Sequence, residues 1–88
     1  MQLKCLFDMV TMDDEIIAVP VGNGAEEIHG VLKVNKEGQE ILELLKNQTN
    51  ENQIVDDLME KYSNNRHELV SYVHNFIDML REYGLIKE

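Results

Sequence analysis

HGVLKVNKEG, residues 29–38, is the stretch that decides the fold, because the chain changes character within it. Before Asn35 the sequence holds β-branched alternations and turn residues, whereas after Asn35 apolar residues recur at helical spacing. Asn35 itself is a favourable helix N-cap, because its side chain can accept a hydrogen bond from a backbone N–H of the first turn. Strands followed by helices predict an α+β fold.

Three strands are expected before Asn35, over residues 3–10, 15–21 and 27–34. Turn residues separate them, at 11–14 and at 22–24. Pro20 has no N–H to give to a ladder, so it should lie at a strand end or on an unpaired edge. The short connections predict an antiparallel meander, whose first and third strands are the edges of the sheet.

Three helices are expected after this point, over residues 36–47, from Asn50 to a break at 63–65, and over 66–83. Gly38 weakens the first helix by about 1 kcal/mol relative to alanine, which suggests that another backbone approaches it there. Asn50 followed by Gln53 resembles a capping box for the second helix. Gly84 is the expected C-cap of the third helix, after which Leu85 and Ile86 should fold back onto the core.

The third helix has an apolar arc that spans about half of its circumference, which is wider than the stripe of an ordinary surface helix. Tyr72, Met79 and Tyr83 widen this arc on one flank, and His74 and Arg81 border it on the other. Either this helix contacts several elements, or part of its face awaits a partner.

Composition predicts one small domain that spans residues 1–88. No apolar run approaches the roughly 20 residues of a membrane span. The N-terminus lacks the apolar stretch of a signal peptide, which predicts a cytoplasmic location. The net charge of −9 argues against nucleic acid as a partner and favours a protein or a peptide. Cys5, the only cysteine, is expected to be a small buried hydrophobe.

The residues that could carry chemistry do not form a recognised site. His67 and His74 are two helical turns apart, about 10 Å along the helix axis, too far to hold one zinc ion without a third ligand. The acidic runs do not match a calcium loop, and no phosphate loop or activated nucleophile is evident. We therefore expect no catalytic residue, no metal, no cofactor and no enzyme activity.

The third strand offers a surface for binding. As an edge strand it carries unpaired N–H and C=O groups, which could accept an extended peptide as a further strand. The alternatives are that the third helix covers this edge, or that a second copy does so in a homodimer.

Five runs of the sequence together resemble the PqqD-like family, which is named for a protein of pyrroloquinoline quinone biosynthesis. They are DEIIAVPVG at 14–22, HGVLKVNKEG at 29–38, ILELL at 41–45, FIDML at 76–80 and YGLI at 83–86. The resemblance implies a winged helix-turn-helix variant, in which a three-stranded antiparallel sheet is followed by three helices. That order agrees with the one read from the residues.

Members of this family are peptide chaperones, also called precursor-peptide recognition elements. The resemblance implies that the chain binds the leader of a ribosomally made precursor peptide, which adds as a strand beside the third strand and against the third helix. It implies no catalysis. The partner enzyme, such as a radical S-adenosylmethionine enzyme, a cyclase or a leader protease, is expected to be a separate chain.

Carried onto this sequence, the resemblance implies two sets of site residues. The template strand comprises Glu27, Ile28, His29, Gly30, Val31, Leu32 and Lys33, and the groove wall on the third helix comprises Val70, Val73, His74, Ile77 and Arg81. Lys33, His74 and Arg81 would pair with leader carboxylates. Two alternatives stay open: Val73 and Ile77 are plain core residues, or the opposite flank of Tyr72, Met79 and Tyr83 faces the third strand.

Two other functions compete with leader binding. The first is an adaptor that docks onto an enzyme without contacting its substrate. The second is a winged-helix protein that places a helix in the major groove of DNA. The charge disfavours the second, because Arg66 and Arg81 are the only fixed positive charges of the third helix.

Overall fold

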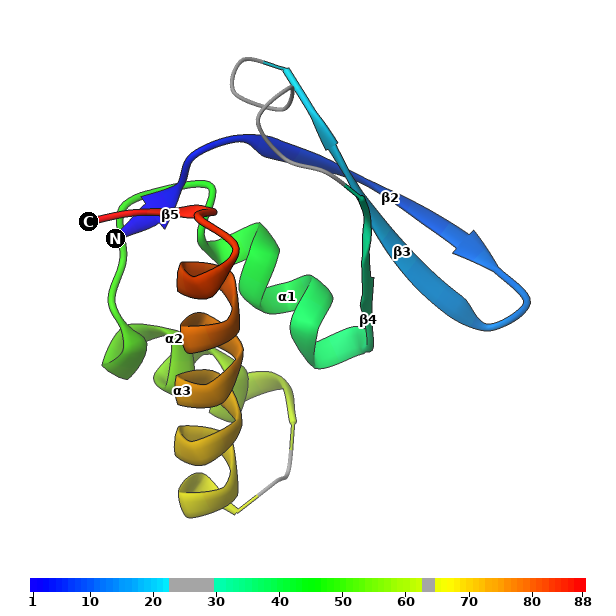
Figure 1. Ribbon diagram of the computed structural model, residues 1–88. Helices are drawn as coiled ribbons and strands as arrows, with labels where there is room; N and C mark the ends of the chain where they lie inside the picture. Colours follow the sequence, from blue (N-terminus) through cyan, green and yellow to red (C-terminus); the bar gives the residue numbers. More distant parts are fainter. Residues whose placement is uncertain (23–29, 63–64) are drawn as a thin grey trace.

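The computed structural model describes residues 1–22, 30–62 and 65–88. The elements, in chain order, are β1 (Gln2–Leu3), β2 (Leu6–Met12), β3 (Glu15–Val21), β4 (Leu32–Val34), α1 (Lys36–Leu44), α2 (Glu51–Lys61), α3 (Arg66–Glu82) and β5 (Ile86–Lys87). The helices lie to one side of a sheet, and the β2–β3 hairpin extends beyond them (Figure 1). The α+β order of a sheet followed by three helices is confirmed.

The main sheet is antiparallel, with the strand order β2-β3-β4. β3 lies in the middle, so β2 and β4 are the edges, as the meander predicts. β4 pairs with β3 only from Ile16 to Ala18, so Pro20 lies beyond this pairing and opposes Phe7 of β2. The missing N–H of Pro20 therefore costs no bond to β4.

A tight turn joins β2 to β3. Its two central residues, Asp13 and Asp14, have φ values of 49° and 68°, in the left-handed region that favours glycine. Two consecutive left-handed residues are typical of the type I′ turn, which matches the twist of a hairpin. The predicted turn at 11–14 is confirmed at Asp13 and Asp14, whereas Thr11 and Met12 belong to β2 and pair with Ile16 and Glu15.

The first and third strands differ from their predicted bounds. Residues 3–10 do not form one strand, because the chain bends at Lys4 and Cys5, and β1 leaves the meander to pair with the C-terminal β5. The third strand begins at Leu32: Gly30 is a bend with a φ of 101°, which interrupts extended geometry. The predicted strand residues Glu27, Ile28 and His29 lie outside the described residues.

The helix caps largely follow the prediction. The predicted caps Asn35 and Asn50 each accept a hydrogen bond from a backbone N–H of the following turn, and Asn65, which the sequence placed in a break, caps α3 in the same way. The capping box is only half formed, because the Gln53 side chain donates to Asp57 at 3.0 Å instead of returning to the cap. α1 ends three residues earlier than predicted and α3 one residue earlier.

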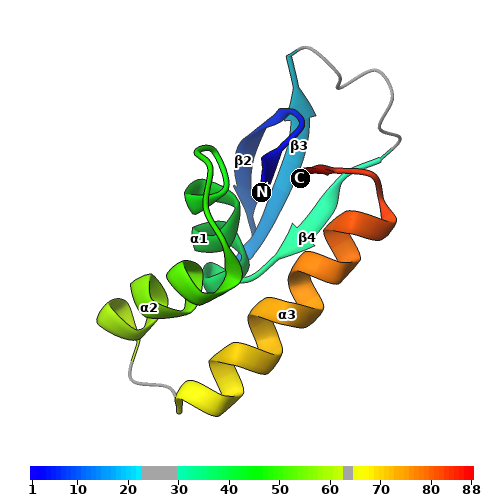
Figure 2. The same cartoon turned by 90° about the vertical axis from the view of Figure 1, so that its left-hand side faces the viewer.

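Gly84 closes α3 in a Schellman motif. Its φ is 71°, its N–H donates to the carbonyl of Arg81, and the N–H of Leu85 donates to the carbonyl of Leu80. The chain then turns back, and Leu85 and Ile86 become buried. β5 pairs with β1, which brings the two ends of the chain together (Figure 2). The predicted return of the C-terminal residues to the core is confirmed.

One core joins the helices to the inner face of the sheet. Among its members, Val73 and Ile77 of α3 have no exposed surface. Gly38 of α1 is also buried, but the group that approaches it is a side chain and not a backbone. A Cβ at Gly38 would lie 2.9 Å from the Phe76 ring and 3.1 Å from Cβ of Val34. The reading of Gly38 as a site of backbone approach was therefore wrong.

Cys5 is a free and buried thiol, as expected. Burial raises its pKa above the ordinary value of a thiol, which lowers the fraction of the reactive thiolate. We expect iodoacetamide to alkylate Cys5 slowly in the folded chain and much faster in denaturant, as followed by mass spectrometry. Equal rates would show that the N-terminal residues are not packed as described.

No helix in the described part of the chain is both long enough and apolar enough to cross a membrane.

Candidate functional site

The outer edge of β4 is the first component of the candidate site. β4 pairs with β3 on one side, and no backbone hydrogen bond joins its other side to any of the described residues. In an antiparallel ladder alternate residues direct their N–H and C=O groups to the two sides of the strand. The outer side of β4 therefore carries backbone groups that can pair with a further strand.

The side chains of β4 alternate between the two faces of the sheet. Leu32 and Val34 are half-buried and pack against the core. Lys33 is exposed on the opposite face, where its Nζ lies 3.6 Å from a carboxylate oxygen of Glu15. This ion pair is exposed at both ends, so it contributes little to stability and leaves Lys33 accessible.

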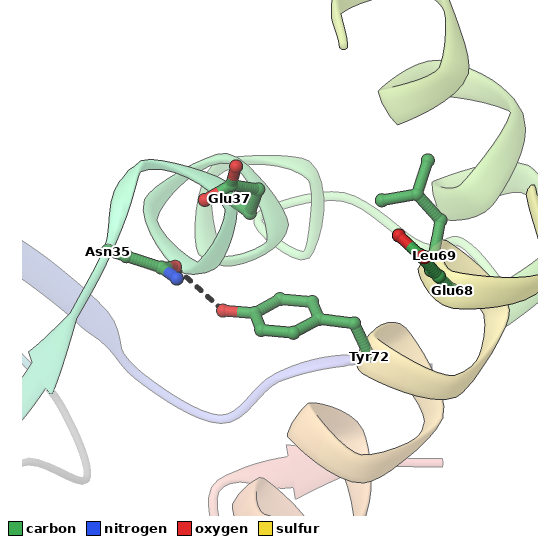
Figure 3. Close-up of a pocket in the computed structure, with 5 residues that line it drawn as sticks. All are labelled: Asn35, Glu37, Glu68, Leu69 and Tyr72. Carbon is green, nitrogen blue, oxygen red and sulfur yellow. Dashed lines mark hydrogen bonds between the residues drawn. The ribbon is translucent and has the colours of Figure 1, made fainter. Parts of the chain in front are cut away.

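Tyr72 links α3 to the end of β4. Its hydroxyl donates to Oδ1 of Asn35 at 2.7 Å, and the same oxygen accepts the N–H of Gly38 that caps α1 (Figure 3). Burial raises the pKa of Tyr72, and the nearby Glu37 carboxylate acts in the same direction. The phenol therefore stays protonated and keeps its role as a donor to Asn35.

A hollow of about 270 Å³ lies beside this hydrogen bond. Its walls are Asn35, Glu37, Glu68, Leu69 and Tyr72. Figure 3 shows that these residues come from the start of α1 and the first half of α3. The hollow thus marks where the end of β4 and α3 approach each other.

Phe76 extends the Tyr72 flank by one helical turn. The two rings are stacked, with their centroids 6.0 Å apart and their planes 26° apart. Phe76 lies against Gly38, whose missing side chain makes room for the ring. The flank of α3 that faces β4 and α1 is therefore aromatic, and Met79 and Tyr83 follow on the same flank.

His74 and Arg81 lie on the opposite flank of α3. Nδ1 of His74 is 3.0 Å from Glu51, the first residue of α2, and Nε2 is 3.2 Å from Asp78. Nε of Arg81 donates to Glu88 at 2.7 Å, and its guanidinium also lies 3.2 Å from Asp78. These contacts direct both side chains toward α2 and the C-terminus, away from β4.

The predicted site residues thus separate into distinct places. Gly30 and Val31 are exposed beside β4, while Leu32 and Lys33 belong to it. Val70 is 44% exposed, whereas Val73 and Ile77, which were predicted to line the groove, have no exposed surface. Val73 and Ile77 are therefore core residues, and the flank of α3 that carries Tyr72 faces β4. The sequence analysis had left both of these alternatives open.

Sequence reasoning did not include Asn35 and Phe76 in the site. Asn35 was interpreted only as a helix cap, and Phe76 only as a packing residue of the apolar arc. Neither pattern indicated that the residue also lies beside the candidate site. The signal that connects them is Gly38, because a glycine within a helix requires a neighbour that needs the space.

No group of three or more His, Cys, Asp or Glu residues that could hold a metal ion occurs among the residues described.

Comparisons with known proteins identify similar chains. A family model described as coenzyme PQQ synthesis protein D (PqqD) matches residues 9–86. Among solved structures, TbiB1 in complex with the TbiA(beta) leader peptide is similar, with a TM-score of 0.70 and 21% identity over 99% of this chain and 95% of that chain. No curated protein matches at a significant level. The likeness to TbiB1 supports the fold.

Proposed function

Because the chain belongs to the family of coenzyme PQQ synthesis protein D, we propose that it is a non-catalytic peptide chaperone. In this proposal the chain binds the leader segment of a ribosomally synthesised precursor peptide and presents it to a separate modifying enzyme. The observation that carries the proposal is the outer edge of β4, which has no backbone partner among the described residues and lies beside an aromatic flank of α3.

The proposed mode of binding is strand addition. The leader pairs its backbone with the outer edge of β4 and becomes the fourth strand of the sheet. Main-chain hydrogen bonds of this kind supply affinity for many sequences, while pockets for alternate side chains supply specificity. The similar protein TbiB1 was solved with a leader peptide, which is consistent with a peptide as the ligand of this fold.

The proposed wall of the groove is the flank of α3 that carries Tyr72, Phe76, Met79 and Tyr83. Tyr83 is 58% exposed and the other three are half-buried, so they combine apolar surface with access. Aromatic side chains of this kind provide contact area at a low cost in conformational entropy. Apolar residues of the leader are therefore expected to face α3.

The test is isothermal titration of the purified chain with leader peptides encoded near its gene. Saturable one-to-one binding in the micromolar range or tighter supports the proposal. The absence of heat, together with the absence of amide shifts in NMR spectra, would remove leader binding and favour an adaptor that contacts only the enzyme.

The positions of the two arginines of α3 disfavour nucleic acid as a binding partner. Nη1 of Arg66 lies 2.8 Å from Asp56, and Arg81 contacts Asp78 and Glu88. Both fixed positive charges of α3 are therefore engaged by carboxylates, which is unfavourable for contacts with phosphates.

Replacement of Val31 with proline is expected to weaken leader binding roughly tenfold, which corresponds to about 1.4 kcal/mol. The pairing of β4 with β3 starts at Leu32, so proline at position 31 removes an N–H that the described ladder does not use. Titration calorimetry measures the affinity, and an unchanged thermal midpoint shows that the fold is intact. Full affinity in a folded V31P chain would place the leader elsewhere.

A further inference from the structure

The face of the sheet that points away from the helices is largely apolar. Cross-strand partners share a face, and Phe7, Met9 and Ala18 belong to the inner one, where Phe7 and Ala18 are buried in the core. The outer face therefore carries the alternate residues of each strand. Its apolar members are Leu6, Val10, Met12, Ile17, Val19 and Val21.

This outer sheet face is accessible in the chain by itself. Leu6 is 55% exposed, Val10 is 41% exposed and Met12 is 60% exposed, while the three apolar residues of β3 are half-buried. Figure 1 shows the hairpin reaching past the helices, which lie on its other side. Six apolar side chains on one exposed sheet face form a larger patch than scattered surface hydrophobes, and such patches mark interaction sites.

The tip of the same hairpin is acidic. Asp13 and Asp14 form the turn, and Asp8 and Glu15 lie on the outer sheet face. β2, β3 and their turn contain no Lys or Arg, and the one positive charge of the three-stranded sheet is Lys33 of β4, whose Nζ already lies 3.6 Å from Glu15. Asp13 and Asp14 also hold left-handed backbone conformations that glycine adopts at lower cost. The turn therefore carries two carboxylates at positions where glycine would adopt the same backbone conformation at lower cost.

We propose that the outer sheet face, with the acidic hairpin tip at its border, is the docking surface for the modifying enzyme. The complementary surface of that enzyme is an apolar patch bordered by Lys or Arg residues that meet Asp13 and Asp14. This inference rests on the proposed function, because it requires a modifying enzyme as partner.

The position of the face supports this partner. A leader that adds to β4 becomes the next strand of the sheet, so half of its side chains lie on the same face as Lys33, Ile17 and Val10. An enzyme seated on the outer sheet face then contacts the chain and the bound leader together. The leader is consequently expected to increase the affinity of the enzyme for the chain.

Charge favours an enzyme over a second copy of the chain. Each copy carries a net charge of −9, so pairing through this face would bring two negative molecules together. A basic partner gains attraction from the same charges. Association with the enzyme should therefore weaken as the salt concentration rises.

The test uses the purified full chain and the purified peptide-modifying enzyme encoded in the same gene cluster. Replacement of Val10 with lysine is expected to weaken enzyme binding at least tenfold, while leader affinity stays within twofold. Met59→Lys is the matched control, because Met59 is an exposed apolar residue of α2 (37%) and lies off this face. If V10K lowers the thermal midpoint strongly, Met12→Lys replaces it, because Met12 is the most exposed apolar residue of the face.

The charge of the tip is tested by the double replacement of Asp13 and Asp14 with asparagine. Asparagine tolerates the left-handed conformation, so the turn is kept and only the charges are lost. Enzyme binding should weaken severalfold, and its dependence on salt should decrease.

Each outcome separates the two proposals. Enzyme affinity that is the same in wild-type, V10K and M12K chains would overturn the docking surface while leader binding still stands. If the wild-type chain binds no leader, but binds the enzyme and loses this binding in V10K, the proposed leader binding is wrong and the docking surface stands. Sedimentation equilibrium that shows a dimer, split by V10K, would assign the face to a second copy and overturn the proposal.

Discussion

The free energy of unfolding is expected to fall by about 3 kcal/mol when Ile77 is replaced with alanine, within the range observed for large core side chains. Ile77 has no exposed surface in the structure, so its truncation removes apolar contacts and leaves a cavity. Urea denaturation monitored by circular dichroism measures this loss. If Ile77 instead lined an open groove, the change in stability would be small and the change in leader affinity would be large.

A matched pair on the same helix separates burial from helix propensity. Val73 and Val70 are both on α3, yet Val73 has no exposed surface and Val70 is 44% exposed. Val73→Ala removes two buried methyl groups and is expected to lower the free energy of unfolding by about 2 kcal/mol. Val70→Ala is expected to be neutral or slightly stabilising, because alanine has the higher helix propensity. Equal losses in the two variants would contradict the described orientation of α3.

Leader affinity is expected to fall at least tenfold when Tyr72 is replaced with alanine. Tyr72 presents an aromatic wall beside the end of β4 and holds Asn35 through its hydroxyl at 2.7 Å, and truncated aromatic anchors typically dominate the loss of binding energy at interfaces. Titration calorimetry with the leader peptide measures the effect. Tyr72→Phe should lower leader affinity by less, because the ring remains and only the hydrogen bond to Asn35 is removed.

Arg81→Gln is the control from the opposite flank of α3. Arg81 contacts Asp78 and Glu88, so its replacement is expected to leave leader affinity unchanged. If R81Q binds the leader much more weakly and Y72A keeps full leader affinity, the leader lies on the flank of α3 that faces α2.

The main elements were predictable because their signals are local. Asn35, Asn50 and Asn65 cap helices through hydrogen bonds to residues two or three positions away, and Gly84 ends α3 through its own φ. The pairing of β1 with β5 is different, because it joins residues at opposite ends of the chain. No local pattern distinguishes a strand that leaves the meander from one that stays in it.

The site was only partly predictable for a related reason. The apolar arc of α3 identified the residues that pack, but not which flank faces which neighbour. That orientation depends on packing between residues far apart in the sequence, and contacts such as His74 with Glu51 and Tyr72 with Asn35 show its outcome. The edge position of β4 followed from the meander, whereas the interruption at Gly30 depends on a φ of 101° that glycine permits but does not require.

The pairing of the first residues with the last ones also constrains how the domain assembles. Gln2 pairs with Lys87 and Leu3 with Ile86. Among the strand pairings of the described residues, this one closes the longest loop, and longer loops have a larger entropic cost of closure. During translation β1 has no strand partner until Ile86 leaves the ribosome, although the N–H of Leu3 can already donate to the carbonyl of Leu45. The helices and the β2–β3 hairpin can form earlier, so we expect the pairing of β1 with β5 to be the final step of folding.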